Sequence, residues 1–196
     1  MSLRPAATIS IAAALVVALA GCVAFEQPPS AQLGCDTKLA GHWLPEGENN
    51  GVEVKLDQQC RAHFPPRDNG RLPAYDTTVR SFTLDGHDYL VLTAHDVEQI
   101  LGLATSDFAA TAPAGSVFVL RYRIDGDRLQ ALQVDADFVA KAIASRRIRG
   151  REASKTLLVI EGDAPAMTAL LRAQPALFDT ADTDKAMRLR RSGATP

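Results

Sequence analysis

Two Asp-Gly pairs, Asp85-Gly86 and Asp125-Gly126, constrain the fold of this chain more than any other feature, because each stands between two β-rich runs. The four runs are residues 78–84, 89–93, 117–124 and 129–134. Asp and Gly both tolerate the positive φ that a tight two-residue hairpin turn requires. The pattern therefore predicts two antiparallel hairpins in the middle of the chain.

Further segments extend this predicted sheet and cover it. Residues 51–56 alternate apolar and polar side chains, which is typical of a half-buried strand, and residues 155–161 form an apolar run that ends at Gly162. Helices are predicted at 135–145 and 163–173, where an Asp begins each segment and apolar side chains share one face. We expect a mainly β fold, an antiparallel sheet or small barrel of six to seven strands, with two covering helices.

The first 22 residues have the layout of an export signal. Arg4 gives a positive start, and the almost wholly apolar residues 6–20 follow it. This run of about 15 residues is shorter than the roughly 20 that a membrane-spanning helix needs. It ends in Leu-Ala-Gly-Cys at residues 19–22, which resembles the lipobox of bacterial lipoproteins.

The lipobox resemblance implies that residues 1–21 are a signal peptide and that the thiol of Cys22 carries a diacylglycerol. Three acyl chains in all would make Cys22 a permanent membrane anchor. The residue after the lipidated cysteine acts as an address in that family, and Val23 in place of Asp points to the outer membrane, with the domain facing the periplasm. An ordinary signal peptide whose cleavage site includes a cysteine is the alternative.

The two ends of the chain are predicted to be linkers around one domain. Residues 22–34 are largely polar and contain proline, so they predict a tether between the lipid and a single β-rich domain at 35–180. Residues 181–196 carry three arginines without apolar periodicity, so they predict a flexible basic tail that is solvated or touches anionic lipid. The net charge of −2 gives no basic excess for binding nucleic acid.

Cys35 and Cys60 are the cysteines that remain after Cys22 is assigned to the lipid. An exported chain meets an oxidising compartment, and a pair of cysteines there is most simply a disulfide. A metal site that uses both thiols with His42 or His63 is the alternative, although the spacing fits no compact ligand cluster.

A Gly-x-Trp pattern at Gly41 and Trp43 resembles the first strand of the lipocalins. The resemblance implies a small antiparallel barrel in which Gly41 permits a close approach and the indole of Trp43 closes one end of the core. The order of elements also resembles uncharacterised proteobacterial lipoproteins, in which such a strand precedes a segment like 116–135 and a helix-strand-helix end like 136–178.

Catalytic signals are few, since the chain contains no Gly-x-Ser-x-Gly, no His-Glu-x-x-His and no phosphate-binding glycine loop. The residues from which a hydrolytic triad could be drawn are His87-Asp88 and His95-Asp96, with Ser106 or Ser116 as the nucleophile. Adjacent residues on a strand point to opposite faces, which disfavours a relay. The acidic residues that could bind calcium are Asp125, Asp127, Asp135 and Asp137, but they lack the spacing of an EF-hand.

The sequence therefore predicts a non-enzymatic lipoprotein, anchored to the outer membrane through Cys22, that binds another envelope protein or has a structural role. No cofactor, metal or nucleic-acid partner is expected. A lipocalin-like carrier of a small apolar ligand is the second hypothesis, and an envelope hydrolase is the third.

Overall fold

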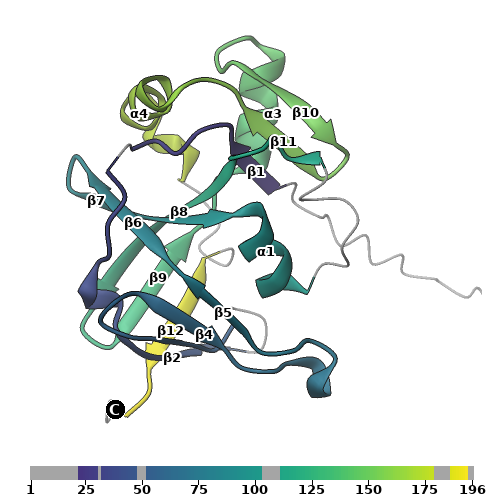
Figure 1. The fold of residues 1–196 in the computed structure, drawn as a ribbon. Coiled ribbons are helices and arrows are strands. Elements are labelled where there is room, and N and C mark those ends of the chain that lie inside the picture. The colour runs from purple at the N-terminus through teal and green to yellow at the C-terminus, as the bar shows by residue number, and fades with distance from the viewer. Residues whose placement is uncertain (1–21, 31, 48–51, 103–110, 179–185, 194–196) are drawn as a thin grey trace, which may run out of the picture.

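The computed structural model describes residues 22–30, 32–47, 52–102, 111–178 and 186–193, in which twelve strands form one mixed sheet (Figure 1). The strands are β1 (Cys22–Phe25), β2 (Gly41–Pro45), β3 (Val54–Leu56), β4 (Arg61–Phe64), β5 (Tyr75–Thr78), β6 (Arg80–Leu84), β7 (His87–Thr93), β8 (Val117–Asp125), β9 (Arg128–Leu132), β10 (Gly150–Ser154), β11 (Leu157–Ile160) and β12 (Met187–Arg191). The α-helices are α1 (Ala94–Leu101), α3 (Ala136–Ala144) and α4 (Ala164–Ala173), and the 3-10 helices are η1 (Thr37–Leu39), η2 (Asp68–Gly70) and η3 (Pro175–Leu177).

Ten of the strands pair in the order β10-β11-β1-β8-β9-β12-β2-β3-β4-β5. Two strands lie off this path: β7 pairs with β8, and β6 pairs with β7. The mainly β class is confirmed. The sheet is open and mixed, so a closed barrel is not confirmed, and the described residues alone contain more strands than the predicted six or seven. Among the described residues, no helix is long and apolar enough to span a bilayer.

Both Asp-Gly hairpins form where the sequence predicts them. Asp85 and Gly86 have φ values of 50° and 79° in the turn between β6 and β7. Gly126 has a φ of 60° in the turn between β8 and β9, where Asp125 pairs with Arg128. The predicted helices are α3 and α4, and the carboxylates of their N-cap residues, Asp135 and Asp163, accept hydrogen bonds from the backbone of the first turn.

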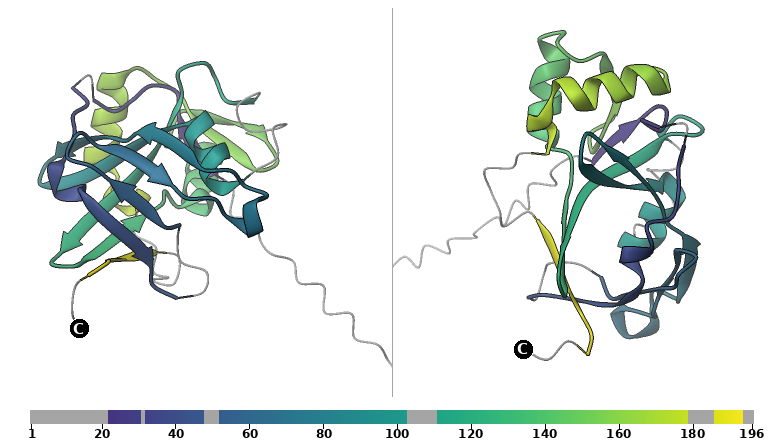
Figure 2. Two further views of the ribbon diagram at one scale, coloured as in Figure 1. Left: turned by 60° about the horizontal axis from the view of Figure 1, so that its bottom comes forward. Right: turned by 90° about the vertical axis from the view of Figure 1, so that its left-hand side faces the viewer.

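The sheet divides into two regions that share β7 and β8, whose side chains enter both hydrophobic cores (Figures 1 and 2). The curved region contains β2 to β7, β9, β12 and α1, and only Val79 separates β5 from β6 as the chain bends around the core. The helix-covered region contains β1, β10 and β11 with α3 and α4. Trp43 lies in the core of the curved region, and Phe25 lies in the core of the helix-covered region.

The predicted tether at residues 22–34 is wrong for its first four residues, which form β1. This strand runs parallel to β11 and pairs with β8 through Phe25 and Val117. Val23, Ala24 and Phe25 are all at most 5% exposed. A strand that is covered on both faces has no polar alternation, so a short apolar run beside prolines does not reveal it.

The predicted flexible basic tail is wrong for Met187–Arg191, which form β12 between β2 and β9. Met187 and Leu189 pack into the core of the curved region. On the other face, the guanidinium of Arg190 lies 3.6 Å from the carboxylate of Asp127. The arginines therefore belong to a half-buried strand with a period of two residues.

Candidate functional site around the first strand

Cys22 begins β1, and its side chain points to the face of the sheet that α1 covers. It packs, with Ala24, against a cluster that includes Val97 of α1 and Phe118 of β8. The backbone N–H of Cys22 donates to the carbonyl oxygen of Thr156 at 2.8 Å. The residue is half-buried and is the free cysteine of the described chain. Burial raises the pKa of its thiol, which makes the unmodified side chain a poor nucleophile.

An apolar cleft with a volume of about 80 Å³ lies beside Cys22. Its walls include Val97, Ile100 and Leu101 of α1, Phe118 and Leu120 of β8, and Met187 of β12. Gln133 contributes the polar side chain to a lining that is otherwise apolar, apart from the thiol of Cys22. Pockets for drug-sized ligands have volumes of about 300 Å³ or more, so this cleft fits only a small apolar group or part of a larger one.

A buried carboxylate fixes the start of α1 above this cleft. The side chain of Asp96 accepts hydrogen bonds from the backbone N–H and the hydroxyl of Thr93, which together form a capping box. It also accepts from the hydroxyls of Tyr75 and Thr77, at 2.8 and 2.7 Å. Burial by itself raises the pKa of Asp96, but these hydrogen bonds outweigh it and hold the pKa below its usual value.

The same network acts on Tyr75, whose pKa is raised to about 12 by burial and by its hydrogen bond to Asp96. The phenol therefore stays protonated and continues to donate at any physiological pH. The strand β5 is in this way tied to the first turn of α1.

The last turn of α1 is fixed by the segment before β5. The guanidinium of Arg67 donates to the carbonyl oxygens of Gln99 and Ile100, two of the acceptors that a helix end leaves unpaired. Gly102 ends the helix with a φ of 64°, and a Cβ there would lie 2.5 Å from a methyl carbon of Leu72. Glycine is therefore required at this C-cap for both conformation and space.

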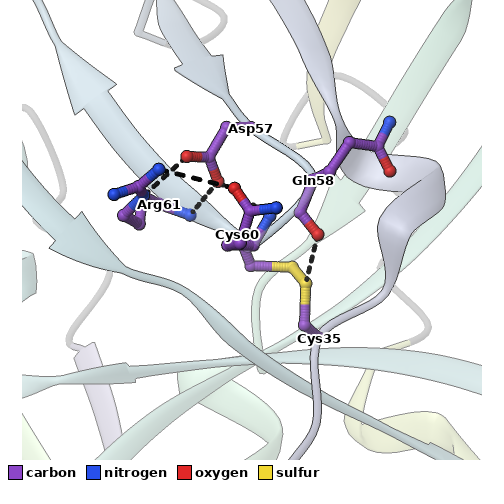
Figure 3. Close-up of polar contacts among 6 residues, drawn as sticks. Cys35, Asp57, Gln58, Cys60 and Arg61 are labelled. Carbon is purple, nitrogen blue, oxygen red and sulfur yellow. Dashed lines mark hydrogen bonds and ion pairs between the residues drawn. A yellow bond between two sulfur atoms is a disulfide. The ribbon is translucent and has the colours of Figure 1, made fainter.

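The predicted disulfide between Cys35 and Cys60 is present, with Cα atoms 5.6 Å apart (Figure 3). Cys60 lies in a turn held by Asp57, whose carboxylate accepts from the backbone N–H of Arg61 at 2.9 Å and pairs with its guanidinium at 2.6 Å. The bridge joins this turn to the segment before η1. The alternative metal site with His42 or His63 is wrong because the two thiols are bonded to each other.

Trp43 is fully buried in the curved region. Its indole N–H donates to the carbonyl oxygen of Leu39 at 2.7 Å, and the guanidinium of Arg191 lies 4.4 Å above the ring. Arg191 also donates to the carbonyl oxygen of Ala40 at 2.7 Å. A Cβ at Gly41 would lie 3.2 Å from the Arg191 guanidinium, so glycine leaves room for the arginine to cover the indole.

The described residues that were considered for a hydrolytic triad do not come together. His95 and Asp96 lie on α1, and the Asp96 carboxylate is occupied by the bonds described above. Asp88 accepts instead from the hydroxyl of Thr83 at 2.6 Å. Ser116 is buried, and Ser106 lies outside the described residues.

Two histidine–carboxylate pairs escaped the sequence analysis because they depend on strand pairing. His63 of β4 lies 2.7 Å from the carboxylate of Asp76 on β5, and His42 of β2 lies 2.7 Å from Glu53 beside β3. His63 and Asp76 are direct cross-strand partners, which only the register reveals. Both pairs are solvent-accessible.

Within the described ranges, no three His, Cys, Asp or Glu side chains gather to hold a metal ion. Two of the four acidic residues considered for calcium have other partners. Asp135 caps α3, and Asp127 pairs with Arg190.

Comparison with known proteins gives no relative for this chain. No protein-family model matches it, and neither the curated proteins nor the solved structures give a significant match. The function is therefore argued from the sequence signal and from the geometry around Cys22.

Proposed function

We propose that this chain is a lipid-anchored protein of the bacterial cell envelope, held at the outer membrane through Cys22 and facing the periplasm. The observation that carries the proposal is the Leu-Ala-Gly-Cys motif directly after a short apolar run with a positive start. The Cys35–Cys60 disulfide supports it, because disulfides are typical of an oxidising compartment.

We propose a non-enzymatic role for the domain, as a binding or structural module that contacts another envelope protein. The buried carboxylate Asp96 supports this, because its acceptor sites are used to fix α1 rather than directed at a substrate. The two histidine–carboxylate pairs lie on accessible strand surfaces, where ordinary cross-strand pairing accounts for them.

A lipocalin-like carrier of a small apolar ligand is the second candidate. Gly41 and Trp43 on β2, with a sheet curved around the indole, favour it. The apolar cleft of about 80 Å³ counts against it, since a carried ligand would need a cavity of at least about 300 Å³.

Replacing the anchoring cysteine tests the membrane proposal. The full chain and its Cys22→Ser variant are expressed in a two-membrane bacterium, and inner and outer membranes are separated by density. We expect the wild type in the outer-membrane fraction, with a mass for its N-terminal peptide that includes acyl chains. The variant should be unprocessed or soluble. A variant that stays in the outer membrane after detergent-free washing would refute the proposed anchor.

Lipid extraction of the purified protein separates the two roles. A non-covalent apolar ligand in stoichiometric amount would favour the carrier. Its absence, together with a stable cross-linked complex with an envelope protein, would favour the binding module.

A further inference from the structure

We propose that the outer face of β8, β9 and β12 is a docking surface for an acidic, extended segment of a protein partner. We call this surface the arginine face, and its basic residues are Arg121, Arg123, Arg128, Arg188 and Arg190. The inference rests on the proposed binding role of the domain. It goes further because it assigns that role to one surface and names the chemistry of the partner.

The first argument is the register of the sheet, which places the arginines on one face. Arg123 pairs with Gln130, which pairs with Arg188, and Arg128 pairs with Arg190 in the next row. Direct cross-strand partners point the same way. The residues that alternate with them on β9 and β12 are buried in the core of the curved region: Leu129, Ala131 and Leu189. Like charges directly opposite each other are destabilising, so an anion between Arg128 and Arg190 would relieve their repulsion.

The second argument is the charge of the arginine face, which is opposite in sign to the net charge of −2 of the whole chain. Glu46 and Asp125 line the same surface, and Asp127 pairs with Arg190, so the described side chains that line it include more guanidiniums than carboxylates. The Nε of Arg128 lies 3.6 Å from the carboxylate of Glu46, which is longer than a hydrogen bond, and the Arg128 side chain is 70% exposed. An incoming carboxylate can therefore reach this guanidinium.

The third argument is the shape of the arginine face. Two hollows open on it, with volumes of about 300 and 500 Å³. Arg123 and Gln130 line both hollows, which therefore adjoin along β8 and β9. Pro175 of η3 adds an apolar wall to the larger hollow, and the guanidinium of Arg121 lies there 5.4 Å from the ring centroid of Phe178. A groove of this kind suits a peptide segment better than the flat surface of a bilayer.

The fourth argument is the spacing and type of the basic side chains. Arg121 and Arg123 are two residues apart on β8, and Arg188 and Arg190 are two residues apart on β12, so the members of each pair are about 7 Å apart along the strand. Acidic side chains at alternate positions of an extended peptide have the same spacing. A guanidinium binds a carboxylate through two parallel hydrogen bonds, and arginine is enriched at protein interfaces whereas lysine is depleted.

Titration with a model peptide tests the inference. The full chain, purified in detergent, is titrated against a fluorescein-labelled peptide of alternating glutamate and threonine, and binding is followed by fluorescence anisotropy. Arg123→Gln combined with Arg128→Gln should weaken binding about fivefold, the joint effect of two exposed ion pairs. Arg71→Gln combined with Arg151→Gln removes the same charge from other exposed surfaces and should change binding less than about twofold.

A second variant tests the arginine face by strengthening binding. Glu46→Gln keeps all the arginines and removes the carboxylate beside Arg128, so it should tighten peptide binding about twofold. The urea midpoints of the arginine variants should equal that of the wild type, because Arg123 and Arg128 are exposed. A peptide of alternating lysine and threonine should not bind at this face.

Equal weakening by the two double variants would overturn the inference, because the peptide would then respond only to net charge. If Arg123→Gln with Arg128→Gln weakens binding to phosphatidylglycerol vesicles and leaves peptide binding unchanged, the face contacts a membrane and the inference is also wrong. Cross-linking in cells separates these failures from that of the proposed function. A complex that forms equally with the wild type and this variant would keep the binding role and refute the arginine face. Peptide binding as expected without any complex in cells would refute the envelope partner and keep the chemistry of the face.

Discussion

The curved region and the helix-covered region are held together by different interactions. In the curved region, polar or covalent ties join distant segments: the Cys35–Cys60 disulfide, the hydrogen bonds to Asp96, and Arg191 over Trp43. Tyr122 adds another, since its hydroxyl donates to Asp36 at 2.6 Å, and burial together with this bond raises its pKa. The helix-covered region packs β1 and β11 against α3 and α4 through apolar side chains, and it has polar ties of its own, such as the backbone N–H of Gly162 that donates to the carboxylate of Glu26 at 2.8 Å.

This difference reflects the shape of each region. A curved sheet with short strands such as β3 buries few residues per strand, so specific ties must fix where one segment crosses another. A layer covered by two amphipathic helices buries a continuous apolar surface, and burial alone supplies about 25 cal/mol per Å². We therefore expect specific ties to contribute most to the stability of the curved region, and buried apolar volume to contribute most to that of the helix-covered region.

Trp43→Ala should have the largest effect, because it removes both a buried ring and a specific tie. We expect a loss of about 5 kcal/mol, at the upper end for large aromatic residues in a core, since Arg191 also loses its contact with the indole ring. Urea unfolding followed by circular dichroism measures this. Leu44→Ala, on the same strand but exposed, is the control and should change stability by less than about 0.5 kcal/mol. Water-like emission from wild-type Trp43 would contradict the buried position.

Phe25→Ala should cost about 4 kcal/mol, because it leaves a cavity under α3 and α4 where packing is the main source of stability. Gln27→Ala, two residues further and exposed, should be neutral. Urea unfolding of both variants is the measurement. If both are equally stable, residues 22–34 behave as a tether and β1 contributes nothing.

Removing the disulfide should cost about 3.5 kcal/mol, the loop-closure estimate for a crosslink between residues 25 positions apart. Cys35→Ala combined with Cys60→Ala gives the value by urea unfolding, and reduction of the wild type should reproduce it. Hydrogen exchange should increase mainly around β4 and η1. An equal increase in hydrogen exchange around β1 and α3 would mean that the two regions unfold as one unit.

Asp96→Asn should cost about 1 to 3 kcal/mol at neutral pH, because the amide can satisfy only part of the acceptor network. The folded pKa of Asp96 lies below its unfolded value, so its stabilisation is complete above the ordinary Asp pKa of about 3.9. The stabilisation is lost as the pH falls through the folded value. Thermal unfolding from pH 7 to pH 2 should therefore show a shallower acid decline in Asp96→Asn than in the wild type.

Local sequence rules predicted the elements whose signals are local. The Asp-Gly turns, the Asp-capped helices α3 and α4, and the β-rich runs all form as expected. The disulfide was predicted from the number of cysteines and from the oxidising compartment that the sequence predicts. Each of these signals lies within a few residues of the feature that it predicts or in the composition itself.

The elements that escaped prediction depend on partners far along the chain. The apolar run of β1 is only four residues long. It forms a strand because it can pair with β11 on one side and with β8 on the other. From the sequence alone, the arginines of β12 predict a solvated tail. The structure shows that the guanidinium of Arg191 lies over the ring of Trp43, which no local pattern predicts. The cleft beside Cys22 needs five separate segments, and no local pattern can describe it.

The parallel pairing of β1 with β11 has a consequence for the order in which the chain folds. Residue 22 can pair with its partner only when residue 157 has been made, and β2 likewise can pair with β12 only when residues 189–191 have been made. Such long-range pairings slow folding, because the chain must close large loops before it gains the contacts. The export proposed for this chain would benefit from that delay, because an exported chain must stay unfolded during translocation. The pairings of β1 with β11 and of β2 with β12 would thus be among the last contacts of the sheet to form.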